Sequence, residues 1–133
     1  MNTKYMLDTN MVSQLLRAHP KVVRLVTSAP MESLCISAVT EGELAFGLAK
    51  RLGATKLAQT VGEFLQRIEI CAWDSEVAQA HGALRADTEK GGLSLAPLDM
   101  MTAAHARCLG ATLVTKDAAF KRVRELKVVD WTT

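Results

Sequence analysis

The residues of this chain that are best suited to chemistry are acidic. Asp8 directly follows a short apolar run, residues 5–7, which predicts a buried strand. Asp117 comes just after a second apolar run, residues 111–115. In an open parallel sheet the carboxyl ends of the strands lie at one edge, and ligands bind there. We therefore expect Asp8 and Asp117 to lie at the same edge.

A third acid, Asp99, occupies the first turn of a predicted helix. Pro97 suits the first position of that helix, and Gly110 suits its end. Because the end of this helix leads into the strand at 111–115, Asp99 is expected nearer the opposite edge of the sheet, unless the start of the helix leans inward. Its position does not follow from topology alone.

The fourth candidate is a glutamate in the helix that follows the strand at residues 34–37. Thr40 and Glu43 have the spacing of a capping box, which places the helix start at Thr40. Glu41 shares one face of this helix with Leu44, whereas Glu43 shares another with Phe46. Helical periodicity therefore does not choose between Glu41 and Glu43.

Each acid taken singly has a simpler structural role, because Asp and Asn often cap helices and acids compensate the helix dipole. Together, clustered carboxylates repel one another, and each raises its neighbour's affinity for a proton. A cation relieves that repulsion, and carboxylate oxygens suit Mg²⁺ or Mn²⁺. If the four acids converge, they predict a site for a divalent metal ion.

The elements that must position these acids alternate along the chain. This alternation predicts an α/β fold with a parallel sheet covered on both faces. The predicted strands are residues 5–7, 34–37, 70–72, 111–115 and 127–129, and the predicted helices are residues 11–16, 20–26, 40–51, 55–68, 74–89, 97–109 and 118–122.

Length and composition agree with an ordinary globular protein. The chain has 133 residues, and we expect a single domain over residues 1–133. The net charge of +2 does not by itself indicate a nucleic-acid partner. No apolar run approaches the roughly 20 residues of a membrane helix, and the N-terminus lacks a secretory signal. The three separated cysteines are typical of reduced thiols, so we expect a cytoplasmic protein that does not act at a membrane.

The segments that carry the four acids resemble the four acid motifs of PIN-domain ribonucleases. The closing segment resembles the tail of the VapC toxins within that family. The matching segments are residues 7–10, 37–44, 98–106, 113–120 and 126–131, and they occur in the family's order and spacing. The resemblance implies a three-layer α/β/α sandwich with four to five parallel strands.

The resemblance also implies an activity and assigns roles to residues. It implies an Mg²⁺-dependent endoribonuclease, for which Mn²⁺ is also suitable. The family places its helix glutamate directly before Leu, which selects Glu43 over Glu41. Asp8, Asp99 and Asp117 would hold the metal, and Glu43 would orient the attacking water. Many VapC toxins have Asn where Asp117 stands, so this chain keeps an acid that relatives can lose.

Other residues are candidates for supporting roles. Thr9, Asn10, Ser37 and Thr115 are candidate supports for the acids. Lys50, Arg51, Lys116, Lys121 and Arg122 are candidate contacts to RNA phosphates, with a solvated charged surface as the alternative. His19, His81 and His105 are too scattered to suggest a zinc site.

The resemblance also implies partners. A VapB-type protein antitoxin would block the toxin, operator DNA would be bound only through that antitoxin, and relatives form homodimers. The resemblance extends to VapC toxins that cut initiator tRNA in the anticodon loop. A different function is a non-catalytic binding module whose acids hold a structural cation, and metal-dependent RNA cleavage distinguishes the two.

Overall fold

The computed structural model describes residues 3–133, and its centre is a sheet of five short strands. The strands are β1 (Tyr5–Leu7), β2 (Leu34–Ser37), β3 (Glu69–Cys71), β4 (Thr112–Val114) and β5 (Val128–Val129). They lie in the order β3-β2-β1-β4-β5, and all neighbouring strands are parallel. The strand order therefore changes direction at β1, where open α/β sheets bind ligands.

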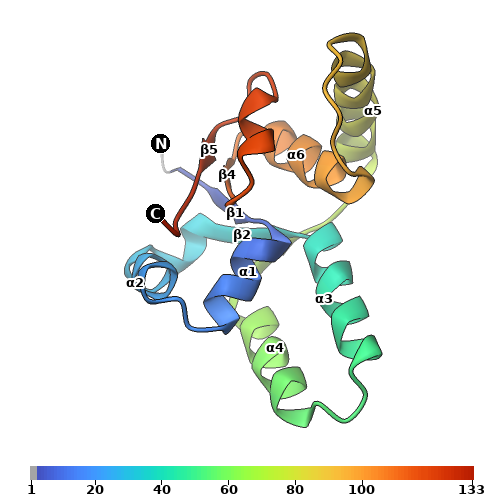
Figure 1. Cartoon of the computed structure of the whole chain (residues 1–133). Helices are drawn as coiled ribbons and strands as arrows, with labels where there is room; N and C mark the ends of the chain where they lie inside the picture. Colours follow the sequence, from blue (N-terminus) through green and yellow to red (C-terminus); the bar gives the residue numbers. More distant parts are fainter. Residues whose placement is uncertain (1–2) are drawn as a thin grey trace.

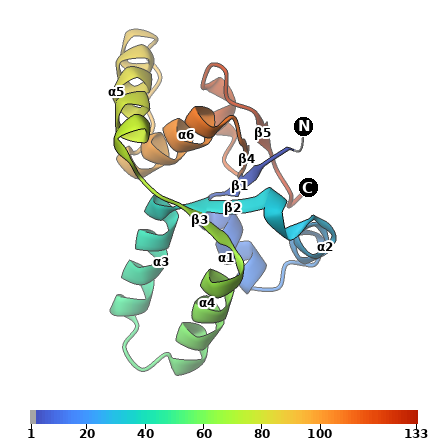
Figure 2. The same cartoon turned by 180° about the vertical axis from the view of Figure 1, so that it is seen from behind.

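Helices cover both faces of this sheet, which confirms the three-layer α/β/α arrangement (Figures 1 and 2). They are α1 (Thr9–Leu16), α2 (Pro20–Ser28), α3 (Ala38–Lys50), α4 (Thr55–Arg67), α5 (Ser75–Lys90) and α6 (Pro97–Leu109), with short 3-10 helices η1 (Met31–Ser33) and η2 (Ala118–Arg122). In Figure 1, α5, α6 and η2 lie on one side of the sheet, and α1 to α4 lie on the other.

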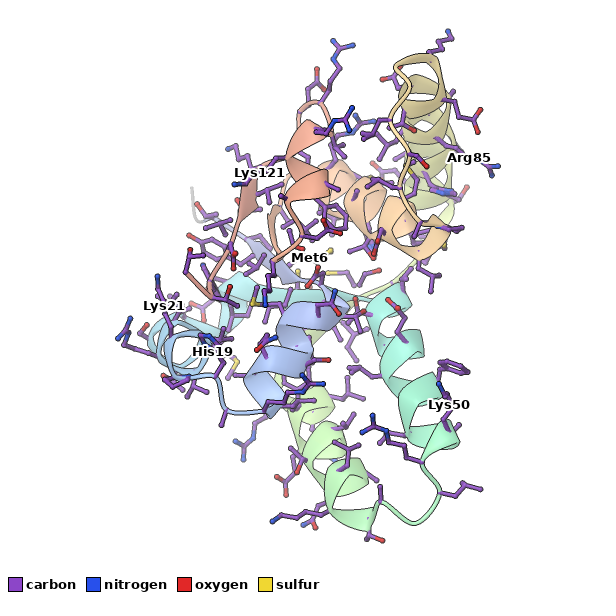
Figure 3. The ribbon with its side chains drawn as sticks, in the orientation of Figure 1. Met6, His19, Lys21, Lys50, Arg85 and Lys121 are labelled. Atoms are coloured by element: carbon purple, nitrogen blue, oxygen red, sulfur yellow. The ribbon has the colours of Figure 1, made fainter. Side chains whose placement is uncertain are left out.

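The alternation of side chains along the strands divides the core into two layers. Met6 of β1 and Leu113 of β4 point to the side of α5 and α6. Leu7 and Val114, their neighbours in sequence, point to the side of α1 to α4. Successive side chains of a strand point to opposite faces, so the central strand β1 is apolar at every position, whereas the edge strand β3 begins with the exposed Glu69. Figure 3 shows Met6 at the centre of the molecule, between the two helical layers.

Helix boundaries follow the residues that favour starts and stops. Pro20 and Pro97 stand at the first positions of α2 and α6, and Asp74 caps α5 by accepting from the Val77 N–H at 3.0 Å. Gly110 ends α6 with φ of 67°, a left-handed conformation that glycine adopts without a steric penalty. These starts and stops agree with the sequence analysis.

The predicted start of α3 at Thr40 is wrong. The helix begins at Ala38, and Ser37 is its N-cap, with its Oγ accepting from the Val39 N–H at 3.0 Å. The capping-box spacing predicted a helix start that is two residues too late, because Ser37 is both the last residue of β2 and the N-cap of α3. No loop therefore separates the strand from the helix. Thr40 is instead buried inside the first turn of the helix.

No helix within residues 3–133 is both long enough and apolar enough to cross a membrane. The three cysteines are free thiols. Trp131 is buried near the C-terminus, and its ring centroid lies 5.2 Å from that of Tyr5 in the central strand. This contact holds the closing segment against β1.

Candidate functional site

Asp8 is the N-cap of α1 and lies at the carboxyl end of the central strand. Its side chain is 6% exposed, and Oδ1 accepts a hydrogen bond from the Met11 N–H at 2.8 Å. Burial raises the pKa of Asp8, hydrogen bonds from Thr115 and Met11 lower it, and the charges of Asp99 and Asp117 raise it further. The net shift is upward, so an ionised Asp8 is destabilised here when no cation is present.

Asp99 lies close to the other acids, and the expectation that it sits nearer the opposite edge of the sheet is wrong. Burial raises the pKa of Asp99, and the charges of Asp117 and Glu43 raise it further. The physical reason is the direction of α6. Its end leads into the start of β4, so the helix runs antiparallel to the strands and begins at their carboxyl edge.

Glu43 reaches the site through α3 and is fixed by a residue of α1. Its Oε1 accepts a hydrogen bond from Thr9 Oγ1 at 2.6 Å. Thr9 Oγ1 also lies 3.4 Å from the hydroxyl of the buried Thr40. Glu41, by contrast, makes no side-chain hydrogen bond in the part of the chain that the structure describes. The contact that distinguishes Glu43 from Glu41 therefore comes from another helix, which periodicity does not reveal.

If the chain cleaves RNA, as its resemblance to PIN-domain ribonucleases implies, we expect Thr9→Val to lower the cleavage rate by about 10- to 100-fold, the range for losing a residue that orients a functional carboxylate. Valine keeps the shape of threonine but removes the donor to Glu43, so the carboxylate loses its fixed direction. The initial rate at saturating Mg²⁺ is the measurement. Thr60→Val is the matched control, because Thr60 Oγ1 bonds only to the Lys56 carbonyl of its own helix. Equal rates in wild type and Thr9→Val would contradict this role.

Asp117 and Thr115 occupy the end of β4 beside Asp8. The backbone N–H of Asp117 donates to Thr115 Oγ1 at 3.1 Å, and Asp117 Oδ1 accepts from the Ala119 N–H at 2.9 Å. Asp117 is therefore both the cap of η2 and a charge that acts on Asp8 and Asp99. The two roles coexist because the cap uses one carboxylate oxygen.

Ser37 does not contact an acid, although the sequence made it a candidate support for one. Its Oγ lies 2.7 Å from His105 Nδ1, and both side chains are fully buried. Burial lowers the pKa of His105, while the charge of Asp74 opposes that shift. The neutral ring also packs edge-on against Trp73, with centroids 5.5 Å apart. Ser37 and His105 thus connect the start of α3, which carries Glu43, to α6, which carries Asp99.

Within residues 3–133, none of the candidate acids forms a salt bridge. The salt bridges among residues 3–133 are Lys4–Glu69 and Arg85–Glu89, and neither involves a candidate acid. Burial and neighbouring carboxylates raise the pKa values of Asp8 and Asp99, and neither acid has a counter-ion in the described residues, so the pair fits a hard divalent cation.

In the described part of the chain, no three His, Cys, Asp or Glu side chains are close enough to hold one ion together. Asp8 and Asp99 still fit Mg²⁺, because that ion keeps several waters and binds to proteins through only one or two carboxylates.

Two hollows flank the acids, and both are lined by Arg17, a residue that the sequence analysis missed. One, of about 360 Å³, lies between α1, α3 and α4 and includes Thr9, Glu43, Lys50 and Arg51. The other, of about 410 Å³, is lined by Asn10, Ser13, Gln14, Arg17, Lys116 and Asp117. The signal for Arg17 was its spacing, because Asn10, Gln14 and Arg17 share one face of a helix.

The remaining candidate RNA contacts lie elsewhere. Arg122 lines a separate hollow with Arg107 and Arg124. Lys121 lies near the closing segment: burial raises the pKa of Asp130, but hydrogen bonds from Thr132 and the charges of Lys116 and Lys121 lower it overall. Figure 3 shows Lys50 and Lys121 on opposite sides of the sheet. The five basic candidates therefore do not form one continuous surface.

Comparisons with known proteins agree with this arrangement. A family model of the PIN domain matches residues 5–126. A protein of Salmonella typhimurium named tRNA(fMet)-specific endonuclease VapC is 31% identical over 129 residues, which cover 96% of this chain and 98% of that protein. A protein of the same name from Shigella flexneri is 33% identical with the same coverage.

Solved structures match as well. The structure of DNA-bound VapBC from Salmonella typhimurium has a chain that matches with a TM-score of 0.90 and 30% identity, covering 98% of this chain and 99% of that one. VapBC2 from Rickettsia felis, bound to a promoter DNA fragment, matches with a TM-score of 0.86 and 29% identity, covering 97% of this chain and 99% of that one. The chain therefore belongs to the PIN-domain family and, within it, to the VapC-type ribonuclease toxins.

Proposed function

We propose that this protein is an Mg²⁺-dependent endoribonuclease that hydrolyses a phosphodiester bond of tRNA, with the anticodon loop of initiator tRNA as its target. The observation that carries the proposal is the group of acids without a counter-ion at the carboxyl edge of β1 and β4. The substrate rests on two relatives that are named tRNA(fMet)-specific endonucleases.

In this proposal Asp8 and Asp99 hold Mg²⁺, and Asp117 completes the site directly or through water. The ion, when bound, polarises the scissile phosphate and offsets charge on the leaving oxygen. Glu43 orients the attacking water and accepts its proton, and Thr9 fixes its carboxylate for that task. Thr115 supports Asp8 through its hydroxyl, and the Met11 N–H holds the same carboxylate from the other side. Mn²⁺ would suit these ligands as well.

The proposal includes a protein antitoxin of the VapB type. The hollow between α1, α3 and α4 combines apolar walls with cations, and its lining residues include Leu44, Phe46, Arg17 and Arg51. Phe46 is 65% exposed, and the Lys50 ammonium lies 5.1 Å from the centroid of its ring. An amphipathic helix would cover this surface. The Salmonella and Rickettsia matches are VapBC structures bound to DNA, and we propose that operator DNA is reached here only through the antitoxin.

We also propose that residues 1–133 form one PIN-like domain, that two copies pair through α1 and α2 as a homodimer, and that the protein acts in the cytoplasm. Val23, Leu25 and Val26 of α2 are only partly buried. A two-fold contact would cover them, because such a contact uses the same surface on both copies.

The test is to incubate the purified protein with total tRNA and Mg²⁺ and to sequence the new RNA ends. We expect one dominant cut in the anticodon loop of initiator tRNA, and no cut after chelation of the metal. Cuts in a different RNA would contradict the substrate, while the nuclease assignment would stand. Thermal stabilisation by Mg²⁺ without cleavage of any RNA would instead support a non-catalytic cation-binding module.

A further inference from the structure

The hollow between α1 and Lys116, which we name the α1 hollow, consists almost entirely of polar residues. Two of its lining residues are cationic, three carry amide or hydroxyl groups, and one is acidic. They are Asn10, Ser13, Gln14, Arg17, Lys116 and Asp117. A hollow of about 410 Å³ with this lining offers hydrogen-bond donors rather than apolar contact. Its chemistry suits an anion.

In residues 3–133, the side-chain hydrogen-bond donors that line the α1 hollow form no side-chain hydrogen bonds or salt bridges. Neither Arg17 nor Lys116 takes part in the two salt bridges of residues 3–133. The side chains of Asn10, Gln14 and Arg17 make no hydrogen bond within that same stretch of chain. Arg17 is exposed at the end of α1, where it is the C-cap residue. These groups are available to a ligand without breaking an internal contact.

The α1 hollow adjoins the acids through Asp117, the one candidate acid among its lining residues. Asp117, whose charge raises the pKa of both Asp8 and Asp99, forms one wall of it. Asp8 and Arg17 cap opposite ends of α1, so about 13 Å separates them along the helix axis at 1.5 Å per residue. A chain that enters at the acids can therefore continue along α1 to Arg17. The distance is too long for Arg17 to bind the same phosphate as Asp8.

We propose that the α1 hollow is an RNA subsite in which Arg17 and Lys116 bind a backbone phosphate a few nucleotides from the scissile bond. This inference rests on the proposed ribonuclease function. Guanidinium groups bind phosphate through two parallel hydrogen bonds, and Lys116 adds a point charge. Asn10 and Gln14 can donate to the same phosphate or to the adjoining ribose. Such contacts fix the position of the strand and carry no sequence information themselves.

The experiment compares Arg17→Ala and Lys116→Ala with Arg67→Ala in cleavage of a ten-nucleotide RNA. Arg67 is a matched control, because it is an exposed arginine in the last turn of α4, at the opposite edge of the sheet. We expect each subsite variant to raise KM by about 5- to 10-fold, as for loss of one phosphate contact, with kcat changed less than about twofold. Arg67→Ala should match wild type, and Arg17→Lys should recover part of the loss.

Salt dependence gives a second readout that a purely structural role would not change. Loss of one phosphate contact should make the slope of log affinity against log salt less negative by about 0.7. The slope is measured by fluorescence anisotropy with the same RNA and Asp99→Asn protein, with and without the Arg17 substitution. This binding assay does not need cleavage, so it tests the subsite even if the proposed activity fails.

Two outcomes overturn the inference. An unchanged KM and an unchanged salt slope in Arg17→Ala would show that the α1 hollow holds no phosphate. A fall in kcat at constant KM would place Arg17 at the scissile bond instead. If Arg17→Ala has a lower urea midpoint than wild type, the substitution destabilises the fold. Arg17→Gln is then measured in its place, and the same two outcomes would overturn the inference. Absence of cleavage by wild type, with a normal salt slope in binding, would contradict the proposed function alone.

Discussion

Replacing Asp8 by Asn is expected to abolish RNA cleavage while leaving the fold intact. Asparagine has the size of aspartate and caps helices about as well, so its side chain can keep the hydrogen bond from the Met11 N–H. It removes an anionic ligand that Mg²⁺ needs. We expect kcat/KM to fall by at least about 10²- to 10³-fold, the range for losing one preorganised electrostatic group. The assay is cleavage of the identified RNA at several Mg²⁺ concentrations.

The same substitution should have opposite effects on stability with and without metal. The folded-state pKa values of Asp8 and Asp99 are raised above the ordinary 3.8, so the stability these groups contribute is fully present below that pH. It is lost as the pH rises through the raised values. At pH 7 without metal, Asp8→Asn should therefore melt at an equal or higher temperature than wild type. Wild type should gain stability from Mg²⁺, about 2.7 kcal/mol at 100 times Kd, and the variant should not.

Asp74→Asn is the matched control for Asp8→Asn. Asp74 caps α5 through the same kind of hydrogen bond, but it is exposed. The control should retain both cleavage and the stabilisation by Mg²⁺. Full activity in Asp8→Asn would remove Asp8 from the site and reduce it to a helix cap.

His105→Ala is expected to destabilise the protein by about 2–4 kcal/mol, from a buried cavity and the lost hydrogen bond. Both His105 and Ser37 are fully buried, so water cannot replace the missing partner. Cleavage should also fall by about 10- to 100-fold, because this bond ties the helix of Glu43 to the helix of Asp99. His105→Asn should recover part of both losses, since its amide can occupy the position of Nδ1. Urea unfolding and the Kd for Mg²⁺, measured well below the melting temperature, are the readouts.

A double-mutant cycle separates the bond from general packing. Ser37→Ala and His105→Ala should be less than additive in stability, since the second change removes a bond that the first has already broken. His81→Ala is the control, because His81 also lies edge-on to Trp73 but is only half-buried. An unchanged urea midpoint in His105→Ala, or full additivity with Ser37→Ala, would contradict a coupling role.

The helices could be predicted well from the sequence because residues that favour helix starts and stops stand at their ends. Pro97 and Gly110 allow only one reading of the helix between them, and Asp74 caps where expected. The strands were found because parallel strands covered on both faces are rich in apolar residues. The start of α3 was missed because Ser37 serves β2 and α3 at once, whereas Thr40 offered the more familiar spacing.

The candidate site was harder to predict, since it depends on contacts between helices. Helical periodicity could not decide whether Glu41 or Glu43 belongs to the site. In the structure, the hydrogen bond from the Thr9 hydroxyl of α1 to Glu43 distinguishes the two. Asp99 was misplaced because the antiparallel course of α6 against the strands was not taken into account. Arg17 was missed because its neighbours in the α1 hollow, Lys116 and Asp117, come from the far end of the chain.

The central position of β1 affects how the molecule forms during synthesis. β1 and α1 are synthesised before the other helices and strands, yet β1 pairs on one side with β4, and the pair Tyr5–Thr112 joins residues far apart in the sequence. Asp99 and Asp117 come from that late part of the chain. Because the chain is synthesised from its N-terminus, a nascent chain that has not yet reached α6 contains Asp8 and Glu43 but lacks the other two acids. The acidic site is therefore completed only after the segment that carries Asp99 and Asp117 has been synthesised.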